Sequence, residues 1–162
     1  MKANFQRSGF MDLALADARA AMALGEVPVG ALIVDAAGAI VARAHNRVVI
    51  DRDPTAHAEL LAIRAAARAL DSERLAGCDL YVTLEPCAMC AQAIAFARLR
   101  RLYFGAADPK GGGVLHGARL FQQPTCHHRP EVYDGIGEAE ASRLLKAFFR
   151  ERRGTGTAGP GT

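Results

Sequence analysis

Apolar positions form short continuous runs in some parts of the chain and recur with helical spacing in others, so the pattern alone predicts strands and helices. Residues 27–34 (VPVGALIV) are almost wholly apolar and predict a buried strand, and residues 39–44 (AIVARA) predict the returning strand of a hairpin. Residues 79–84 (DLYVTL) and 100–105 (RRLYFG) predict two more strands. The long segment before EVYDG, at 131–135, permits a crossover that makes this fifth strand parallel to the fourth.

Helical spacing of apolar residues predicts four helices around these strands. Ser8 is the candidate N-cap of the first helix and Gly25 its candidate stop. Pro54 and Pro86 mark the starts of the second and third helices. Two strands followed by alternating helices and strands predict a three-layer α/β sandwich. The helices are expected, in chain order, at residues 8–25, 54–70, 86–97 and 138–153.

Length and composition indicate one globular domain. We expect it to span residues 1–153, and we expect residues 154–162 (GTGTAGPGT) to be disordered, because no large apolar residue anchors them. No apolar run approaches the roughly 20 residues of a membrane-spanning helix, and the N-terminus reads as an amphipathic helix rather than a secretion signal. A cytoplasmic protein without a membrane partner is therefore expected. The net charge of +3 permits an anionic partner but does not require one.

Two cysteines in the stretch TLEPCAMC are the first candidates for chemistry. Without a secretion signal, a metal site or a catalytic role is more plausible than a disulfide framework. Cys87 and Cys90 lie one helical turn apart, so their thiolates project to the same side. Upstream, PTAHAELLAI supplies His57 and Glu59 near the start of another predicted helix. One histidine and two cysteines suit Zn²⁺ and leave its fourth position open, which is the arrangement of a catalytic zinc.

The combined His-x-Glu and Pro-Cys-x-x-C pattern is typical of zinc deaminases that act on nucleobases. Glu59 is expected to carry a proton from the attacking water to a ring nitrogen and then to the leaving amine. Taken singly, Cys-x-x-C also occurs in redox couples and in zinc ribbons, but a ribbon needs a second pair that this chain lacks. Cys78 and Cys126 are isolated and are expected to be packed thiols.

Several segments together resemble the bacterial tRNA-specific adenosine deaminase family, a branch of the cytidine deaminase-like superfamily. They are EVPVGA, Asn46, DPTAHAE, TLEPCAMC, FGAADPKGG and FFRERR, and the likeness covers the chain up to the glycine-rich tail. The zinc motifs alone mark the superfamily and do not choose the base. The resemblance implies an α/β/α sandwich around a five-stranded mixed sheet, a homodimer, one zinc ion per subunit and no organic cofactor. It also implies conversion of the wobble adenosine, position 34 of a tRNA anticodon, to inosine.

The resemblance also implies roles for individual residues. Asn46 would hydrogen-bond the target base, and Val29 and Ala58 would line its pocket. Asp108 and Lys110 would meet the ribose and phosphates of the anticodon loop. The residues that would contact flanking nucleotides are Phe149, Arg150, Arg152 and Arg153.

From Lys110 the chain reads KGGGVLHGARLF, where many members of the family read Gly-Ala-x-Gly-Ser after the lysine. Further on it reads PTCHHRPEVY, where many members read Asn-His-Arg. Individual RNA contacts within residues 111–129 are therefore not assigned. In FFRERR, Phe148 is expected in the core. Outside the resemblance, arginines at a helix C-terminus are ordinarily solvated and complement its dipole.

Two rival functions stay open on sequence alone. A deaminase of a free base or nucleoside, such as guanine, cytosine or cytidine, would use the same zinc, Glu59 and Asn46. A zinc-stabilised RNA-binding module without catalysis would not need Glu59. The basic aromatic C-terminus favours an RNA substrate, because a free-base enzyme has no use for it.

Overall fold

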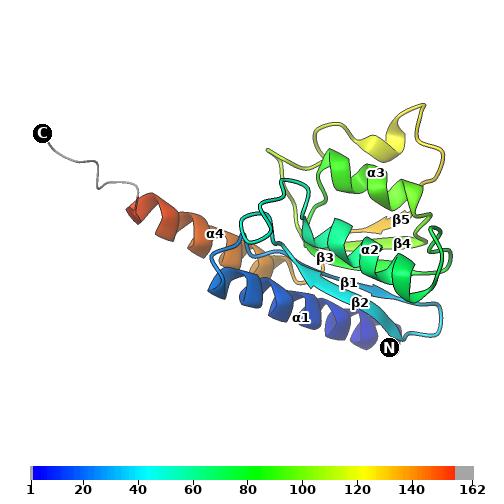
Figure 1. The fold of residues 1–162 in the computed structure, drawn as a ribbon, viewed down its shortest axis with the longest axis horizontal. Helices are drawn as coiled ribbons and strands as arrows, with labels where there is room; N and C mark the ends of the chain where they lie inside the picture. Colours follow the sequence, from blue (N-terminus) through cyan, green and yellow to red (C-terminus); the bar gives the residue numbers. More distant parts are fainter. Residues whose placement is uncertain (1, 156–162) are drawn as a thin grey trace, which may run out of the picture.

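The computed structural model describes residues 2–155, with side chains from 8 to 154. Met1 and residues 156–162, which hold most of the predicted tail, lie outside the described residues. Within the described range, helices and strands alternate after an initial hairpin (Figure 1). In chain order the elements are α1 (Lys2–Ala23), β1 (Gly30–Val34), β2 (Ile40–His45), α2 (Ala58–Ala69), β3 (Asp79–Leu84), α3 (Ala88–Phe96), β4 (Arg101–Ala106), the 3₁₀ helix η1 (Leu120–Gln122), β5 (Glu131–Tyr133) and α4 (Glu138–Thr155).

The strands form one mixed sheet in the order β2-β1-β3-β4-β5. β1 pairs antiparallel with β2 and β3, whereas β3, β4 and β5 run parallel. The hairpin turns at Asp35, whose carboxylate accepts hydrogen bonds of 2.9 Å from the N–H groups of Ala37 and Ala39. The predicted hairpin and the parallel fifth strand are thus confirmed.

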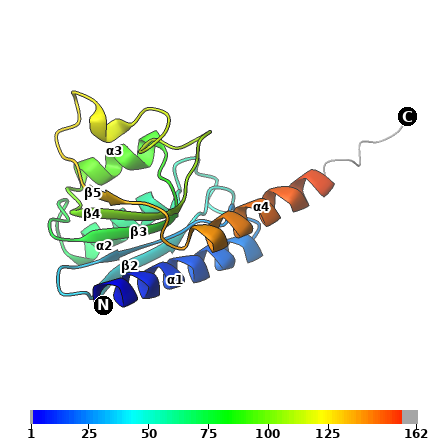
Figure 2. The same cartoon turned by 180° about the vertical axis from the view of Figure 1, so that it is seen from behind.

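Helices cover both faces of the sheet, α2 and α3 on one and α1 and α4 on the other (Figures 1 and 2). Consecutive residues of β1 enter different cores. Ala31 and Ile33 belong to the core under α2 and α3, whereas Leu32 and Val34 belong to the core that contains Met11 of α1. A strand buried on both faces reads as a continuous apolar run, which is why its sequence shows no alternation. The three-layer α/β/α sandwich is therefore confirmed.

The first helix ends as predicted but begins earlier, so Ser8 lies inside α1 rather than at its cap. At the other end Gly25 has a φ of +81°, and the N–H groups of Gly25 and Glu26 donate to carbonyls of the last turn. α1 then packs so closely on β1 that a Cβ atom at Gly30 would lie 1.9 Å from the carbonyl oxygen of Ala14. No described helix, α1 included, has the apolar length that a bilayer crossing requires.

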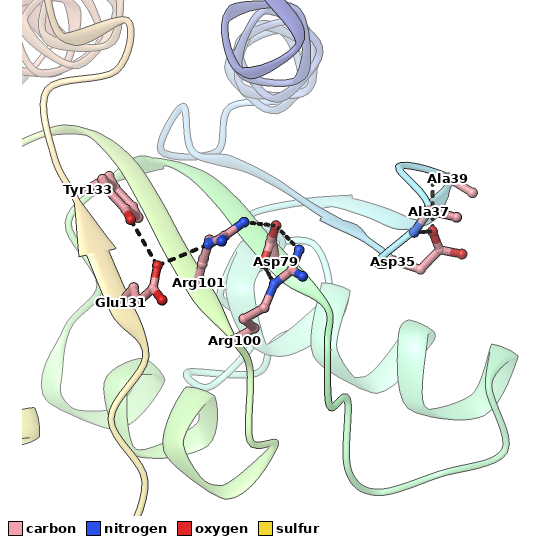
Figure 3. Close-up of polar contacts among 8 residues, drawn as sticks. All are labelled: Asp35, Ala37, Ala39, Asp79, Arg100, Arg101, Glu131 and Tyr133. Atoms are coloured by element: carbon pink, nitrogen blue, oxygen red, sulfur yellow. Dashed lines mark hydrogen bonds and ion pairs between the residues drawn. The ribbon is translucent and has the colours of Figure 1, made fainter. Parts of the chain in front are cut away.

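A polar network joins the starts of the parallel strands β3, β4 and β5 at one end of the sheet (Figure 3). Asp79 accepts hydrogen bonds of 2.9 and 2.8 Å from the guanidinium group of Arg100. Arg101 donates to Glu131 at 3.0 Å, and Glu131 also accepts from the hydroxyl of Tyr133 at 2.8 Å. Parallel strands that begin together also end together, and ligand sites of such sheets form beyond their carboxyl ends. The functional site is therefore expected at the opposite end of the sheet, beyond the carboxyl ends of β3 and β4.

Candidate active site

Three metal-donor side chains meet where α2 and α3 begin. His57 is the N-cap residue of α2 and Cys87 the N-cap residue of α3, both with extended backbone, and Cys90 lies in the first turn of α3. The His57 Nδ1 atom is 3.6 Å from the Sγ atoms of both cysteines. All three donor atoms lie within 4.8 Å of one another.

This geometry differs from the expected helix starts at Pro54 and Pro86. Asp53 accepts hydrogen bonds from the N–H (2.8 Å) and the hydroxyl (2.7 Å) of Thr55, which closes a separate turn before α2. α2 then begins at Ala58 and α3 at Ala88, so a metal-donor residue occupies each N-cap position.

The cluster fits a tetrahedral zinc ion. Zinc binds sulfur at about 2.3 Å and histidine nitrogen at about 2.0–2.1 Å, and a tetrahedral angle then separates these two donors by about 3.6 Å. The observed Nδ1–Sγ separations of 3.6 Å agree with this value. Among the described residues, only His57, Cys87 and Cys90 form such a cluster, and three protein ligands are the number that leaves one position for a reactant.

Hydrogen bonds within the cluster make the two thiols unequal. The pKa of Cys87 is lowered to about 4, chiefly by the hydrogen bond with Cys90 and further by that with His57, while burial opposes the shift. The pKa of Cys90 is raised, because Cys87 and burial both favour its protonated form. The hydrogen bond with Cys87 also raises the pKa of His57. Zinc binding must therefore displace the proton of Cys90, so metal affinity depends on pH.

Glu59 has the environment of a proton carrier. It lies in the first turn of α2, and only 4% of its surface is exposed. Burial raises the pKa of its carboxyl group, and a hydrogen bond with Cys90 partly opposes this shift. A carboxyl group whose pKa lies closer to neutrality exchanges protons with a substrate more readily.

A pocket of about 420 Å³ opens beside these residues, a size suited to a small ligand. His57, Glu59 and Cys87 line it. The substrate-binding residues predicted by resemblance that also line it are Val29, Asn46, Ala58, Asp108 and Arg152.

Most of the remaining predicted contacts line a second, wider hollow of about 900 Å³. It shares Asp108, Gly111 and Arg152 with the first pocket, so the two adjoin. Arg150 is exposed and lines neither of these two hollows. The predicted contacts that line the wider hollow are Asp108, Lys110, Phe149, Arg152 and Arg153. Lys146, which the sequence analysis missed, lines it as well.

The end of α4 reaches the pocket rim through Arg152. Its guanidinium group donates to the carbonyl oxygen of Gly25 at 2.7 Å and lies 4.7 Å from the ring centre of Phe148. Phe148 is buried, as expected for a core residue, whereas Phe149 is 48% exposed.

Two buried carboxylates of the site were not singled out from the sequence. Glu26 lines the pocket, accepts a hydrogen bond of 3.0 Å from Asn46 Nδ2 and accepts another of 2.7 Å from the N–H of Ile50. Glu85, directly before Pro86, lines the pocket as well. Both lie inside the motifs EVPVGA and TLEPCAMC, but only the fold shows what they bind.

Comparison with known proteins agrees with this geometry. Residues 5–106 match the family model of the cytidine and deoxycytidylate deaminase zinc-binding region. A tRNA-specific adenosine deaminase of Agrobacterium fabrum is 57% identical over 91% of this chain and 97% of its own. One from Bacillus subtilis is 47% identical over 89% of each chain.

Solved structures of two kinds of deaminase share this fold. A structure from a study of A-to-I editing by tRNA:A34 deaminases is 58% identical, with a TM-score of 0.83, over 85% of this chain and 99% of the other. A guanine deaminase from Nitrosomonas europaea is 26% identical, with a TM-score of 0.73, over 87% and 83%. Both the sequence identity and the TM-score are higher for the structure from the tRNA:A34 deaminase study. This chain belongs to the tRNA-specific adenosine deaminases of the cytidine deaminase-like superfamily.

Proposed function

We propose that this protein converts the wobble adenosine of tRNA, position 34, to inosine, with one zinc ion per subunit. The reaction consumes one water and releases one ammonia. The observation that carries the proposal is the cluster of His57, Cys87 and Cys90 beside a pocket of small-ligand size, in a chain of this family. The proposal is supported further by the basic and aromatic hollow that adjoins the pocket.

The catalytic roles follow from the chemistry of the side chains. His57, Cys87 and Cys90 would hold the zinc ion, which when bound lowers the pKa of a water so that a nucleophile is available at neutral pH. Glu59 takes a proton from the attacking water and passes it to the ring nitrogen beside the amino-bearing carbon. After the new C–O bond has formed, Glu59 takes the remaining proton from the new hydroxyl group and delivers it to the amino group. The C–N bond then breaks, the carbonyl group of inosine forms and ammonia leaves.

The pocket wall would recognise the purine. Because an ionised carboxylate only accepts hydrogen bonds, the contact with Glu26 fixes the amide nitrogen of Asn46 on that side. The rest of the Asn46 amide is left to meet the edge of the base. Val29 and Ala58 supply apolar surface for the ring.

The rim would bind the rest of the anticodon loop. Proteins read RNA loops as single strands, with bases stacked on aromatic rings or guanidinium planes and phosphates near cations. Asp108 would accept a hydrogen bond from a ribose hydroxyl, and Lys110 would pair with a phosphate. The C-terminal residues assigned to flanking nucleotides are Phe149, Arg150, Arg152 and Arg153.

We further infer a homodimer built on α3. This helix (AMCAQAIAF) has no charged residue, and its outer side exposes Met89 and 72% of Phe96. A helix with no charge and large exposed apolar side chains is normally covered, so a second copy of the chain is the expected cover. We also treat residues 1–153 as one catalytic domain, although α4 continues to Thr155. We place the protein in the cytoplasm, where tRNA is its substrate.

The rival with a supporting observation is a free-base deaminase, since the guanine deaminase neighbour shares the fold. A side-by-side assay separates the two. Zinc-loaded protein is incubated with an adenosine-34 anticodon stem-loop, a guanosine-34 control and free adenosine, cytidine, guanine and cytosine, and inosine and ammonia are measured. Inosine at position 34 without turnover of the free compounds is expected. Ammonia from a free base beside an untouched stem-loop would contradict the tRNA proposal.

A further inference from the structure

Glu85 is a buried carboxylate that the proposed chemistry does not use. It lies between the last residue of β3 and Pro86, and its side chain is fully buried. Five hydrogen bonds reach it, all from a single loop, residues 108–116. The donors are the backbone N–H groups of Asp108 (3.1 Å), Val114 (3.2 Å), Leu115 (3.0 Å) and His116 (3.1 Å), and the ring Nδ1 of His116 (2.8 Å).

The two carboxylate oxygens divide these donors between the two ends of the loop. Oε1 accepts from Asp108 and from the His116 ring, and Oε2 accepts from the three successive N–H groups of residues 114–116. Because a carboxylate only accepts, the His116 Nδ1 atom must carry the proton in this contact. We call this arrangement the Glu85 clasp, meaning Glu85, His116 and the loop 108–116 that they close.

Glycines allow the loop to lie directly on the metal-binding segment. A Cβ atom at Gly112 would lie 2.3 Å from Glu85 Oε2, and one at Gly113 would lie 2.5 Å from the backbone nitrogen of Ala88. The N–H of Gly113 donates to the carbonyl of Pro86 at 2.8 Å. Gly112 and Gly113 are therefore required for this close approach.

The same loop forms part of the substrate wall. Asp108 and Gly111 line the pocket, and Lys110 lines the adjoining hollow. The Asp108 carboxylate accepts from the N–H groups of Lys110 (3.2 Å) and Gly111 (2.9 Å), so the start of the loop is itself ordered. Glu85 thus joins the wall that would meet RNA to the segment that would hold zinc.

We propose that Glu85 and His116 are positioning residues that hold the loop 108–116 in the conformation that binds the anticodon loop. This inference rests on the proposed function. His116 lines neither hollow, and both carboxylate oxygens of Glu85 accept from the loop, so loss of these bonds weakens RNA binding more than it slows the chemical step. A clasp with a merely structural role would instead lower stability and leave the Michaelis constant unchanged.

The test compares His116→Leu with His116→Asn. The asparagine amide can donate from about the position of the imidazole Nδ1, whereas leucine has no donor. His116→Leu is expected to raise KM for the adenosine-34 stem-loop about tenfold, the effect of one lost hydrogen bond to a charged group, with kcat within about twofold. His116→Asn is expected to restore most of this loss. His127→Leu is the matched control, because His127 is exposed and donates none of the bonds to Glu85.

Hydrogen exchange of the backbone supplies a readout that does not depend on activity. The N–H groups of residues 108 and 114–116 are expected to exchange faster in His116→Leu than in the wild type or His116→Asn. Zinc content is measured in every variant, and Glu85→Gln, which removes acceptor capacity, is expected to accelerate exchange further at unchanged zinc content.

The outcomes are distinguishable. An active wild type with unchanged KM and unchanged exchange in His116→Leu overturns the clasp and leaves the proposed function standing. A fall in kcat at unchanged KM also overturns it. A wild type that ignores the stem-loop contradicts the proposed function, and with it the RNA-binding role of the clasp.

Discussion

Two regions of the site are stabilised in different ways. One is the metal-binding region, at the starts of α2 and α3. The other is the pocket rim, formed by loop 108–116 and the end of α4. His57 and Cys87 are each the N-cap residue of a helix whose inner side is buried in the larger core. The rim depends on hydrogen bonds, to Glu85 at the loop and from Arg152 to a backbone carbonyl at α4. The residues that would hold zinc thus lie on helices packed in the core, whereas the residues proposed to bind the RNA lie on polar, partly exposed segments. Changes in the first region should abolish the rate, and changes in the second should alter substrate affinity.

The largest expected effect is loss of the metal. Cys87→Ala removes one of three ligands, so the protein should retain less than stoichiometric zinc and show no detectable inosine formation. Zinc content by atomic absorption and inosine by chromatography measure both. Cys78→Ala, which changes a buried thiol away from the cluster, is the control and should keep its zinc. A fully active, zinc-free Cys87→Ala protein would contradict the assignment of the site.

Next in size is removal of the proton carrier. Glu59→Gln keeps the shape of the side chain but cannot relay protons, and general acid–base catalysis contributes about 10²–10⁴-fold. We expect kcat to fall by at least that factor, with zinc content and the circular dichroism spectrum unchanged. A variant with wild-type kcat would refute the role of Glu59 as the proton carrier.

The rim should show a smaller effect of a different kind. Arg152→Ala removes the contact with Gly25 and a cation from both hollows. KM for the stem-loop is expected to rise about tenfold, with little change in kcat. Steady-state kinetics of Arg152→Ala and of Arg143→Ala, an exposed arginine on the same helix, provide the comparison. Equal increases in KM for the two variants would mean that Arg152 contributes only its positive charge and makes no specific contact with the RNA.

The smallest effect distinguishes two thiols within the metal centre. In metal-free protein the pKa of Cys87 is lowered to about 4, while that of the buried Cys90 is raised. Since the thiolate is the reactive form, alkylation at pH 6 should label Cys87 before Cys90, and its rate should rise through about pH 4 and then level off. Peptide mass spectrometry after a short iodoacetamide pulse measures this. Preferential labelling of Cys90 would contradict the geometry of the cluster.

Much of the fold could be predicted from the sequence because the strands are strongly apolar. β3 begins and ends where the pattern predicts, and β5 lies parallel to β4 because the preceding segment is long enough for a crossover. The starts of α2 and α3 were placed too early, at Pro54 and Pro86. Proline is a common first residue of helices, and the pattern could not show that His57 and Cys87 would take the N-cap positions.

The site was predictable to the same extent. Two short motifs contain the four residues of the chemistry, so their roles could be predicted from neighbouring positions in the sequence. These residues are His57, Glu59, Cys87 and Cys90. Glu85 was missed because its partners lie 23 to 31 residues further along the chain, at distances that only the tertiary fold defines. The same holds for Lys146, which reaches the wider hollow only because α4 crosses the rim.

The most direct test is a single-turnover measurement, because it separates residues that act in the chemical step from residues that act in RNA binding. The rate of inosine formation in a trace of adenosine-34 stem-loop is followed against enzyme concentration for the wild type, Glu59→Gln and Arg152→Ala. We predict that Arg152→Ala reaches the wild-type maximal rate at about tenfold higher enzyme concentration, whereas Glu59→Gln stays far below that rate at every concentration. A lowered maximal rate for Arg152→Ala, or a wild-type maximal rate for Glu59→Gln, would contradict the account.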